Sequence, residues 1–243
     1  MSRFSFIYIG IFSLIISIFS FFNIIYSNYF NLYLNIDSYI YSLIFSFIFG
    51  FIFLIKKKGD IKVSIYEKII TVILGYLILP IFISIPYYFS IYNITFVNAY
   101  FEAVSGFTST GFSIFENIKH LDESLILWRS SSQWIGGLYF LFSIILLIDI
   151  FDLNLKKSLT NYLSFNTSET LKQSTKILIL YIALTFVIFI ILNISSIRSF
   201  NSFNLAMTII SSGGFLPTND LSNIIDTKTK EIFFSLMMLT SFF

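Results

Sequence analysis

Two short polar stretches interrupt a chain that is otherwise strongly apolar. The first, AVSGFTSTGF, covers residues 103–112, and the second, AMTIISSGGF, covers residues 206–215. The two align without a gap at a constant offset of 103 residues, and both end in Gly-Phe. Self-similarity at a fixed spacing marks a repeated structural unit. The sequence therefore predicts that both stretches have the same structure and the same task.

The chemistry that suits these stretches is coordination of a cation by backbone carbonyl oxygens. Small side chains let peptide groups line a narrow path, and glycine adopts backbone angles that other residues adopt only at a cost. A ring of carbonyls can replace the water around a cation. An ordinary loop or a small-residue packing face is the alternative for one stretch alone, and the repeat favours a filter. The predicted ion-binding residues are Thr108, Ser109, Thr110, Gly111, Ser211, Ser212, Gly213 and Gly214.

Two charged residues are predicted to support this filter. Glu102 precedes the first stretch, and a carboxylate at membrane depth is costly without a partner. We interpret Glu102 as a support behind the filter, with attraction of cations as the alternative. Arg129 follows the first stretch. Its open interpretations are an ion pair with Glu102, Glu116 or Asp122, or an anchor at the membrane interface.

The composition predicts a polytopic membrane protein. Of 243 residues, 56% are hydrophobic and 12% are charged, whereas a soluble domain carries about 25% charged residues. A membrane helix needs about 20 apolar residues. The predicted spans are residues 4–26, 39–55, 69–92, 125–150 and 177–195. A sixth apolar run begins near Glu231 and is too short to cross a membrane, so we expect a fragment or a truncated product that ends within a helix.

Each polar stretch follows a short apolar run that cannot cross a membrane. The run ITFVNAYFEAVSGF is 14 residues long, which gives a helix of about 21 Å. Non-helical backbone at this depth is tolerated only where it is buried in protein or lines a water-filled cavity. We therefore expect an all-α fold built from a repeated unit: helix, re-entrant pore helix, filter loop, helix.

The basic residues predict the orientation. If the spans alternate, 10 of the 15 Lys and Arg residues fall on the side that holds the N-terminus and the KKKGD segment. Cytoplasmic loops carry an excess of Lys and Arg. The N-terminus is therefore predicted to be cytoplasmic.

Enzymatic chemistry is disfavoured. The chain has no cysteine and one histidine, His120, and the spans hold no cluster of acidic residues and histidines that a membrane enzyme would need. We expect no enzyme activity, no covalently bound cofactor and no nucleic-acid partner. Trp128 and Trp134 are predicted to lie in the aromatic belt at the membrane interface. Gly136 and Gly137 are predicted to allow close helix contact.

Three stretches together resemble a known family. They are FEAVSGFTSTGFS, LILWRSSSQWIGGLYF and NLAMTIISSGGFLPTNDLS. The second is similar to the W-R-x-x-x-Q-W-x-G-G signature of the membrane subunit of the Trk/Ktr/HKT potassium transporters. The resemblance covers residues 5–243. It implies four pore units around a pseudo-fourfold axis, of which this chain holds two. Residues 1–60 would form two extra N-terminal helices, residues 61–155 the first unit, and residues 156–243 a second unit truncated in its last helix.

The resemblance also implies a function and partners. It implies uptake of K⁺, with Na⁺ as a second candidate, across the cytoplasmic (inner) membrane by a channel or symporter. It further implies contact with membrane lipid, a homodimer of the full-length chain and a cytosolic nucleotide-binding regulatory subunit. Two units cannot enclose an ion. The alternative function is therefore a non-conducting accessory protein or a truncated remnant of such a transporter.

Overall fold

The computed structural model describes residues 3–55, 65–147 and 170–240, and in these ranges every regular element is a helix. Five helices are long and apolar enough to cross a membrane. They are α1 (Arg3–Tyr29), α2 (Ile36–Ile55), α3 (Ile65–Ser90), α5 (Glu123–Leu147) and α7 (Thr170–Ile194). The prediction of an all-α chain with several membrane spans is confirmed, and each helix overlaps the span predicted for it.

Shorter helices connect or follow these spans. They are α4 (Phe96–Phe107), α8 (Ser199–Ile210) and α9 (Lys228–Leu239), with the 3₁₀ turns η1 (Tyr33–Asn35), η2 (Ile118–His120) and η4 (Leu221–Asn223). Helices α4 and α8 have 12 residues each, and at 1.5 Å per residue they are about 18 Å long. Both lie where the sequence predicted short helices. The first begins two residues later than the predicted run, because Thr95 caps it and accepts a hydrogen bond from Asn98 N.

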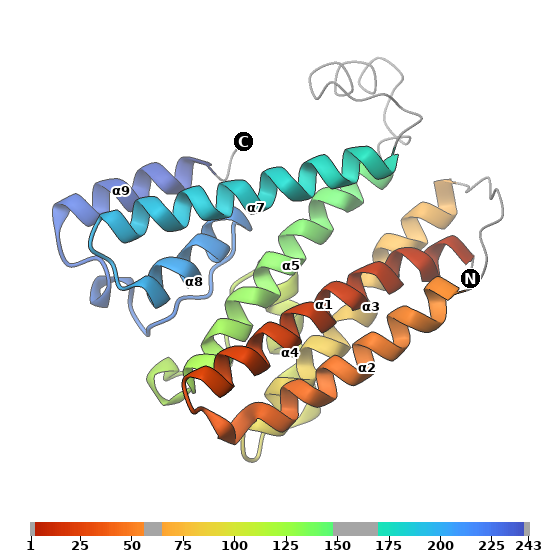
Figure 1. Cartoon of the computed structure of the whole chain (residues 1–243), viewed down its shortest axis with the longest axis horizontal. Coiled ribbons are helices and arrows are strands. Elements are labelled where there is room, and N and C mark those ends of the chain that lie inside the picture. The colour runs from red at the N-terminus through yellow and green to blue at the C-terminus, as the bar shows by residue number, and fades with distance from the viewer. Residues whose placement is uncertain (1–2, 56–64, 148–169, 241–243) are drawn as a thin grey trace.

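The helices form two groups joined by α5 (Figure 1). Helices α1, α2 and α3 pack against one another, and α4 packs against α3. Helices α7, α8 and α9 form the second group. Helix α5 packs against both α4 and α8, so it is the element through which the two short helices are held relative to each other.

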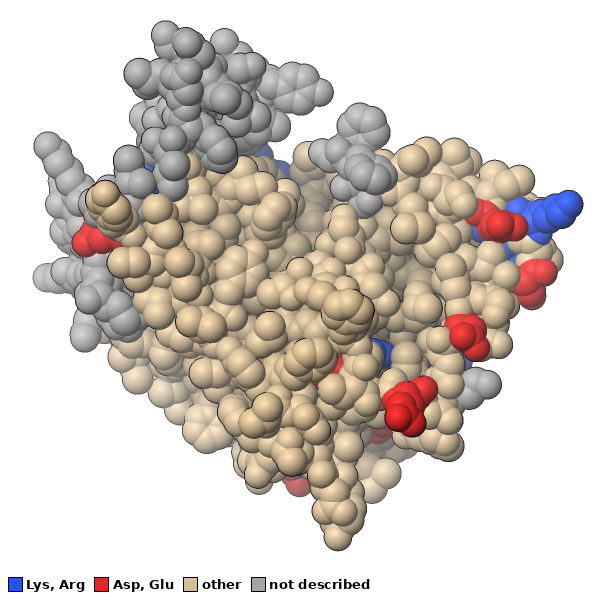
Figure 2. All heavy atoms as spheres, turned by 180° about the vertical axis from the view of Figure 1, so that it is seen from behind, with Lys and Arg blue, Asp and Glu red and all other residues tan. Residues whose placement is uncertain are grey.

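Helix α5 is the most enclosed of the five long helices. In its most apolar window 56% of the residues are buried, compared with 28% in α2 and 22% in α7. Most of the face shown in Figure 2 carries no charged side chain. Exposed apolar side chains on α2 and α7 are what a lipid-facing helix requires, whereas α5 faces protein.

Several serine side chains inside this apolar body find partners within it. Ser20 Oγ donates to Ser42 Oγ at 3.1 Å, which links α1 to α2. Ser13 Oγ and Ser46 Oγ each donate to the carbonyl four residues earlier in their own helix. Hydroxyl groups that bond across or within helices are compatible with an apolar surrounding, because each of these donors has an acceptor.

The aromatic-belt prediction for the two tryptophans is wrong. Trp128 and Trp134 are buried, and each indole N–H has an internal acceptor. Trp128 Nε1 donates to Ile83 O and Trp134 Nε1 donates to Thr185 Oγ1, both at 3.0 Å. Internal acceptors remove the cost of burying the indole N–H. Both tryptophans therefore serve as packing residues between helices.

Two other predictions stay predictions. The proposed unit boundaries at 60/61 and 155/156 lie outside the described residues. Six of the ten basic residues on the predicted cytoplasmic side also lie there, in residues 56–64 and 148–169.

Candidate ion-binding site

The backbone after α4 and the backbone after α8 turn in the same way. We call residues 108–114 the first loop and residues 211–217 the second loop. Ser109 and Ser212, which are matched by the offset, have φ angles of 54° and 52°. The next N–H group in each loop, that of Thr110 or Gly213, donates to the carbonyl five residues earlier at 3.0 or 2.8 Å. This is the hydrogen bond of a Schellman motif at a helix C-terminus. The chain therefore leaves α4 and α8 with the same backbone geometry.

The glycines of the loops are needed for space more than for backbone angle. Among the described glycines, Gly111 alone has a positive φ, of 81°. The left-handed turn of each loop is made by a serine, Ser109 or Ser212. A Cβ atom on Gly111 would lie 2.6 Å from Gly214 Cα, and one on Gly214 would lie 3.0 Å from Gly111 Cα. The two loops therefore meet backbone to backbone at these glycines.

A matched pair of hydroxyl groups, which the sequence analysis did not select as site residues, fastens each loop to its helix. Ser105 Oγ donates to Phe112 O at 2.5 Å, and Thr208 Oγ1 donates to Phe215 O at 3.0 Å. Ser105 and Thr208 align at the offset of 103 residues. A hydroxylated residue at the same position of both repeats was the signal that could have identified them.

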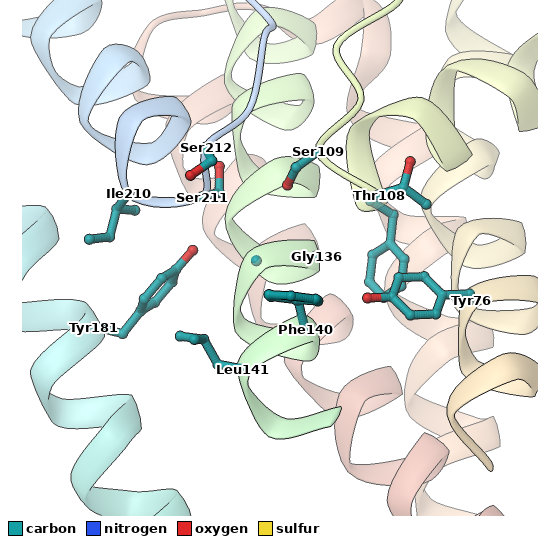
Figure 3. A pocket seen from close by; sticks show the side chains of 12 residues that line it. Tyr76, Thr108, Ser109, Gly136, Phe140, Leu141, Tyr181, Ile210, Ser211 and Ser212 are labelled. Atoms are coloured by element: carbon teal, nitrogen blue, oxygen red, sulfur yellow. The ribbon is translucent and has the colours of Figure 1, made fainter. Parts of the chain in front are cut away.

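A cavity of about 350 Å³ lies at the C-terminal ends of α4 and α8. Thr108, Ser109, Ser211 and Ser212 line it, together with aromatic side chains that include Tyr181. Figure 3 shows Ser109 and Ser212 at a similar height, each beside the residue that precedes it at its helix end. The C-terminal end of a helix carries partial negative charge, so two such ends at one cavity favour a cation there.

The eight predicted ion-binding residues therefore fall into two groups. Thr108, Ser109, Ser211 and Ser212 line the cavity. The other four, Thr110, Gly111, Gly213 and Gly214, follow in the loops, and the two loops touch at Gly111 and Gly214. The structure thus brings both predicted sets together at one place.

Glu102 and Arg129 form a buried ion pair behind the first loop. Arg129 Nε lies 2.9 Å from Glu102 Oε1, and the side chains are 1% and 0% exposed. The same carboxylate accepts hydrogen bonds from Ser113 Oγ and Ile114 N of the first loop. Of the alternatives for Arg129, the pair with Glu102 is the one observed, and the anchor at the membrane interface is wrong. The contacts of Glu102 are those of a support for the loop.

Arg129 also reaches the second loop. Its guanidinium carbon lies 4.2 Å from the centre of the Phe215 ring, and Nη1 donates to Leu216 O at 3.4 Å. A guanidinium over an aromatic face is attracted by the ring quadrupole. One residue of α5 thus contacts the supports of the first loop and the backbone of the second.

Close contact between α5 and both helix ends depends on two glycines. A Cβ atom on Gly136 would lie 1.9 Å from Phe107 O, and one on Gly137 would lie 2.8 Å from Ser211 Cβ. These contacts are of the kind predicted for this pair. They place the end of α4 and the end of α8 on one helix surface.

Comparisons with known proteins identify the family of this chain. The sequence model of the TrkH cation transport proteins matches residues 35–222. An uncharacterized cation transporter of Methanocaldococcus jannaschii is 30% identical over 71% of this chain and 38% of its own length. The Trk system potassium uptake protein TrkG of Escherichia coli is 30% identical over 34% of this chain and 17% of its own length.

A solved structure shows the same fold. The crystal structure of the potassium transporter TrkH from Vibrio parahaemolyticus superposes with a TM-score of 0.74 at 19% identity, over 98% of this chain and 50% of that one. This chain therefore spans half the length of that transporter. It spans 38% of the Methanocaldococcus jannaschii protein and 17% of TrkG. The family is one of transporters and not of enzymes, and the match extends over most of the sequence. The chain belongs to the TrkH family of cation transport proteins.

Proposed function

We propose that this protein contributes part of the wall of a pathway for monovalent cations, with K⁺ as the transported ion. The observation that carries the proposal is the meeting of two loops of equal backbone geometry at Gly111 and Gly214. Both loops begin at the C-terminal end of a short helix. Several relatives are named as potassium uptake proteins, which supports K⁺ over Na⁺.

The pathway would work by exchange of water for protein oxygens. A cation in the cavity is favoured by the partial negative charge of the two helix ends. Carbonyl groups of the loops then take the place of its water. The membrane potential supplies about 2.3 kcal/mol per unit charge for each 100 mV. No covalent step is needed, and whether the cation moves through a channel or by symport is a property of the whole transporter.

The assembly proposed here follows the family fold. Residues 61–155 and 156–243 would be two of four pore units, with residues 1–60 as two additional helices. The other units would come from further sequence of the same transporter. The complete transporter would be a homodimer in the cytoplasmic membrane, with a cytoplasmic N-terminus and a nucleotide-binding regulatory subunit. Support for this assembly is the superposition on half of the solved transporter.

One observation favours the alternative, a non-conducting protein. Phe112 in the first loop is 71% exposed, although the matched Phe215 in the second loop is 1% exposed. The first loop thus lacks, among the described residues, the cover that α5 gives the second. A chain that stays in this state would not conduct, and ion flux separates the two functions.

The test is cation flux into proteoliposomes that contain the protein expressed from its complete gene. We expect K⁺ flux that exceeds Na⁺ flux. Gly111→Ala should reduce that preference at least about tenfold, because φ is positive and the added methyl group overlaps Gly214. Gly10→Ala is the matched control, since a Cβ there lies 3.3 Å from Gly50 O, outside the loops. Absence of K⁺ flux, or an unchanged preference in Gly111→Ala, would contradict the proposal.

A further inference from the structure

Gln133 is a buried polar residue of α5 whose hydrogen-bond partners lie in the second loop and at Thr208 of α8. It follows Arg129 by four residues, which places it on the same face of the helix, and it is 0% exposed. A Cβ atom on Gly213 would lie 2.4 Å from Gln133 Cδ. The side-chain amide therefore lies directly against the backbone of the second loop.

The neighbours of this amide define which end is oxygen. Two backbone N–H groups, those of Gly214 and Phe215, lie 2.9 Å from one end, and Thr208 Oγ1 lies 3.1 Å from the other. Thr208 Oγ1 already donates its proton to Phe215 O, so it can only accept from the amide. An oxygen at the first end and an NH₂ group at the second satisfy every one of these groups.

The hydrogen bonds of Gln133 determine where two carbonyl groups point. In a planar trans peptide the N–H of one residue and the C=O of the residue before it point in opposite directions. Because the N–H groups of Gly214 and Phe215 both point at Gln133 Oε1, the carbonyls of Gly213 and Gly214 both point away from α5. Two successive carbonyl groups on one side of the loop are what coordination of a cation by the backbone requires.

We propose that Gln133 is a positioning residue that holds the Gly213 and Gly214 carbonyls in the orientation that coordinates the cation. The first loop has a different support, the carboxylate of Glu102. Gln133 thus acts in the second loop from a helix of the neighbouring unit. The link to selectivity rests on the proposed function, whereas the orientation of the peptide groups does not.

The first experiment measures amide hydrogen exchange in the complete protein in lipid nanodiscs. Gln133→Met removes the acceptor at nearly constant volume, and exchange at Gly214 and Phe215 should become at least about tenfold faster, because two donors lose their partner. Gln133→Glu retains an acceptor and should stay within about threefold of the unmodified protein. Ser131→Ala is the matched control. Ser131 is buried in α5, and within the described part of the chain its hydroxyl bonds only to Leu127 O of its own helix, so no change at the loop is expected.

Two exchange results would overturn the proposal. They are unchanged exchange at Gly214 and Phe215 in Gln133→Met, or exchange in Gln133→Glu as fast as in Gln133→Met. If Gln133→Met does not fold, Thr208→Val takes its place. It removes the hydroxyl that joins the amide to Phe215 O, and exchange at the same two groups should rise about threefold. An unchanged rate in Thr208→Val would also overturn the proposal.

The second experiment measures the ratio of K⁺ to Na⁺ flux in proteoliposomes. Gln133→Met should lower the ratio about tenfold and leave Na⁺ flux measurable, whereas Ser131→Ala should retain the ratio. An unchanged ratio in folded Gln133→Met would refute the part of Gln133 in selectivity. If the unmodified protein carries no K⁺, the proposed function fails instead, and the exchange experiment still decides whether Gln133 positions the loop.

Discussion

The first and second loops share a backbone geometry and differ in what stands behind it. Both have a serine at φ near 50° and a hydroxyl that holds the phenylalanine carbonyl. The first loop is held mainly by Glu102 of its own short helix, and Arg129 Nη2 of α5 donates to Ser113 Oγ. The second is held by Gln133 and Arg129 of α5, a helix that precedes α8 in the chain. The repeat has therefore preserved the local turn and changed its supports.

This difference separates two levels of structure. The turn itself depends on neighbours in the chain, since its hydrogen bonds join residues three to seven positions apart. The direction in which the turn faces depends on contacts across the fold. Phe215 is covered by the Arg129 guanidinium, whereas Phe112, its equivalent, is 71% exposed. Substitutions in the supports should therefore act unequally on the two loops.

The largest effect is expected from Arg129→Met. This change leaves the Glu102 carboxylate, which is 0% exposed, without its cation. Breaking a buried pair on one side costs about 3–5 kcal/mol, and the loss should appear as a lower free energy of unfolding in mixed micelles. The double variant Arg129→Met with Glu102→Gln should recover part of it, because no unpaired charge remains. A double variant less stable than Arg129→Met would contradict the pairing.

A smaller effect should separate the two phenylalanines. Phe215→Ala empties a buried site beneath the guanidinium and should cost about 3 kcal/mol of unfolding free energy. Phe112→Ala changes an exposed side chain and should stay within about 0.5 kcal/mol. The same unfolding measurement on both variants tests this, and equal losses would show that Phe112 is covered in the assembled protein.

The smallest effect is expected at an exposed ion pair between the start of α8 and the start of α5. Arg198, at the start of α8, lies 2.8 Å from Glu123 at the start of α5, and the side chains are 66% and 34% exposed. An exposed pair contributes about 0.5 kcal/mol or less. Arg198→Gln should therefore change stability by no more than this. The difference should vanish at about 1 M salt, where charges are screened within about 3 Å. A larger loss of stability would show that this exposed pair matters as much as the buried pair of Arg129 and Glu102.

The sequence predicted the parts of the site that depend on local pattern. The offset of 103 residues identified both loops, and the length of the runs before them predicted the short helices. The sequence alone did not identify the partner of Arg129, because three carboxylates lie close to it along the chain. They are Glu102, Glu116 and Asp122. Only the packing of α5 against α4 selects Glu102.

Other errors came from long-range contacts. The two tryptophans read as interfacial residues, but their indole N–H groups find acceptors at Ile83 and Thr185, 45 and 51 residues away. Gln133 was part of the recognised signature but received no role, because its partners lie about 80 residues later. Its spacing of four from Arg129 was the available signal, since such residues share a helix face.

The glycine pair at the centre of α5 has a mechanical consequence. Gly136 packs directly against the end of α4, and Gly137 packs directly against the end of α8. Neither helix end is therefore separated from α5 by a gap. A thermal rotation or tilt of α5 would displace both ends in the same instant. The two helix ends would then move as one rigid body, so the spacing between the two loops would stay constant while α5 moves.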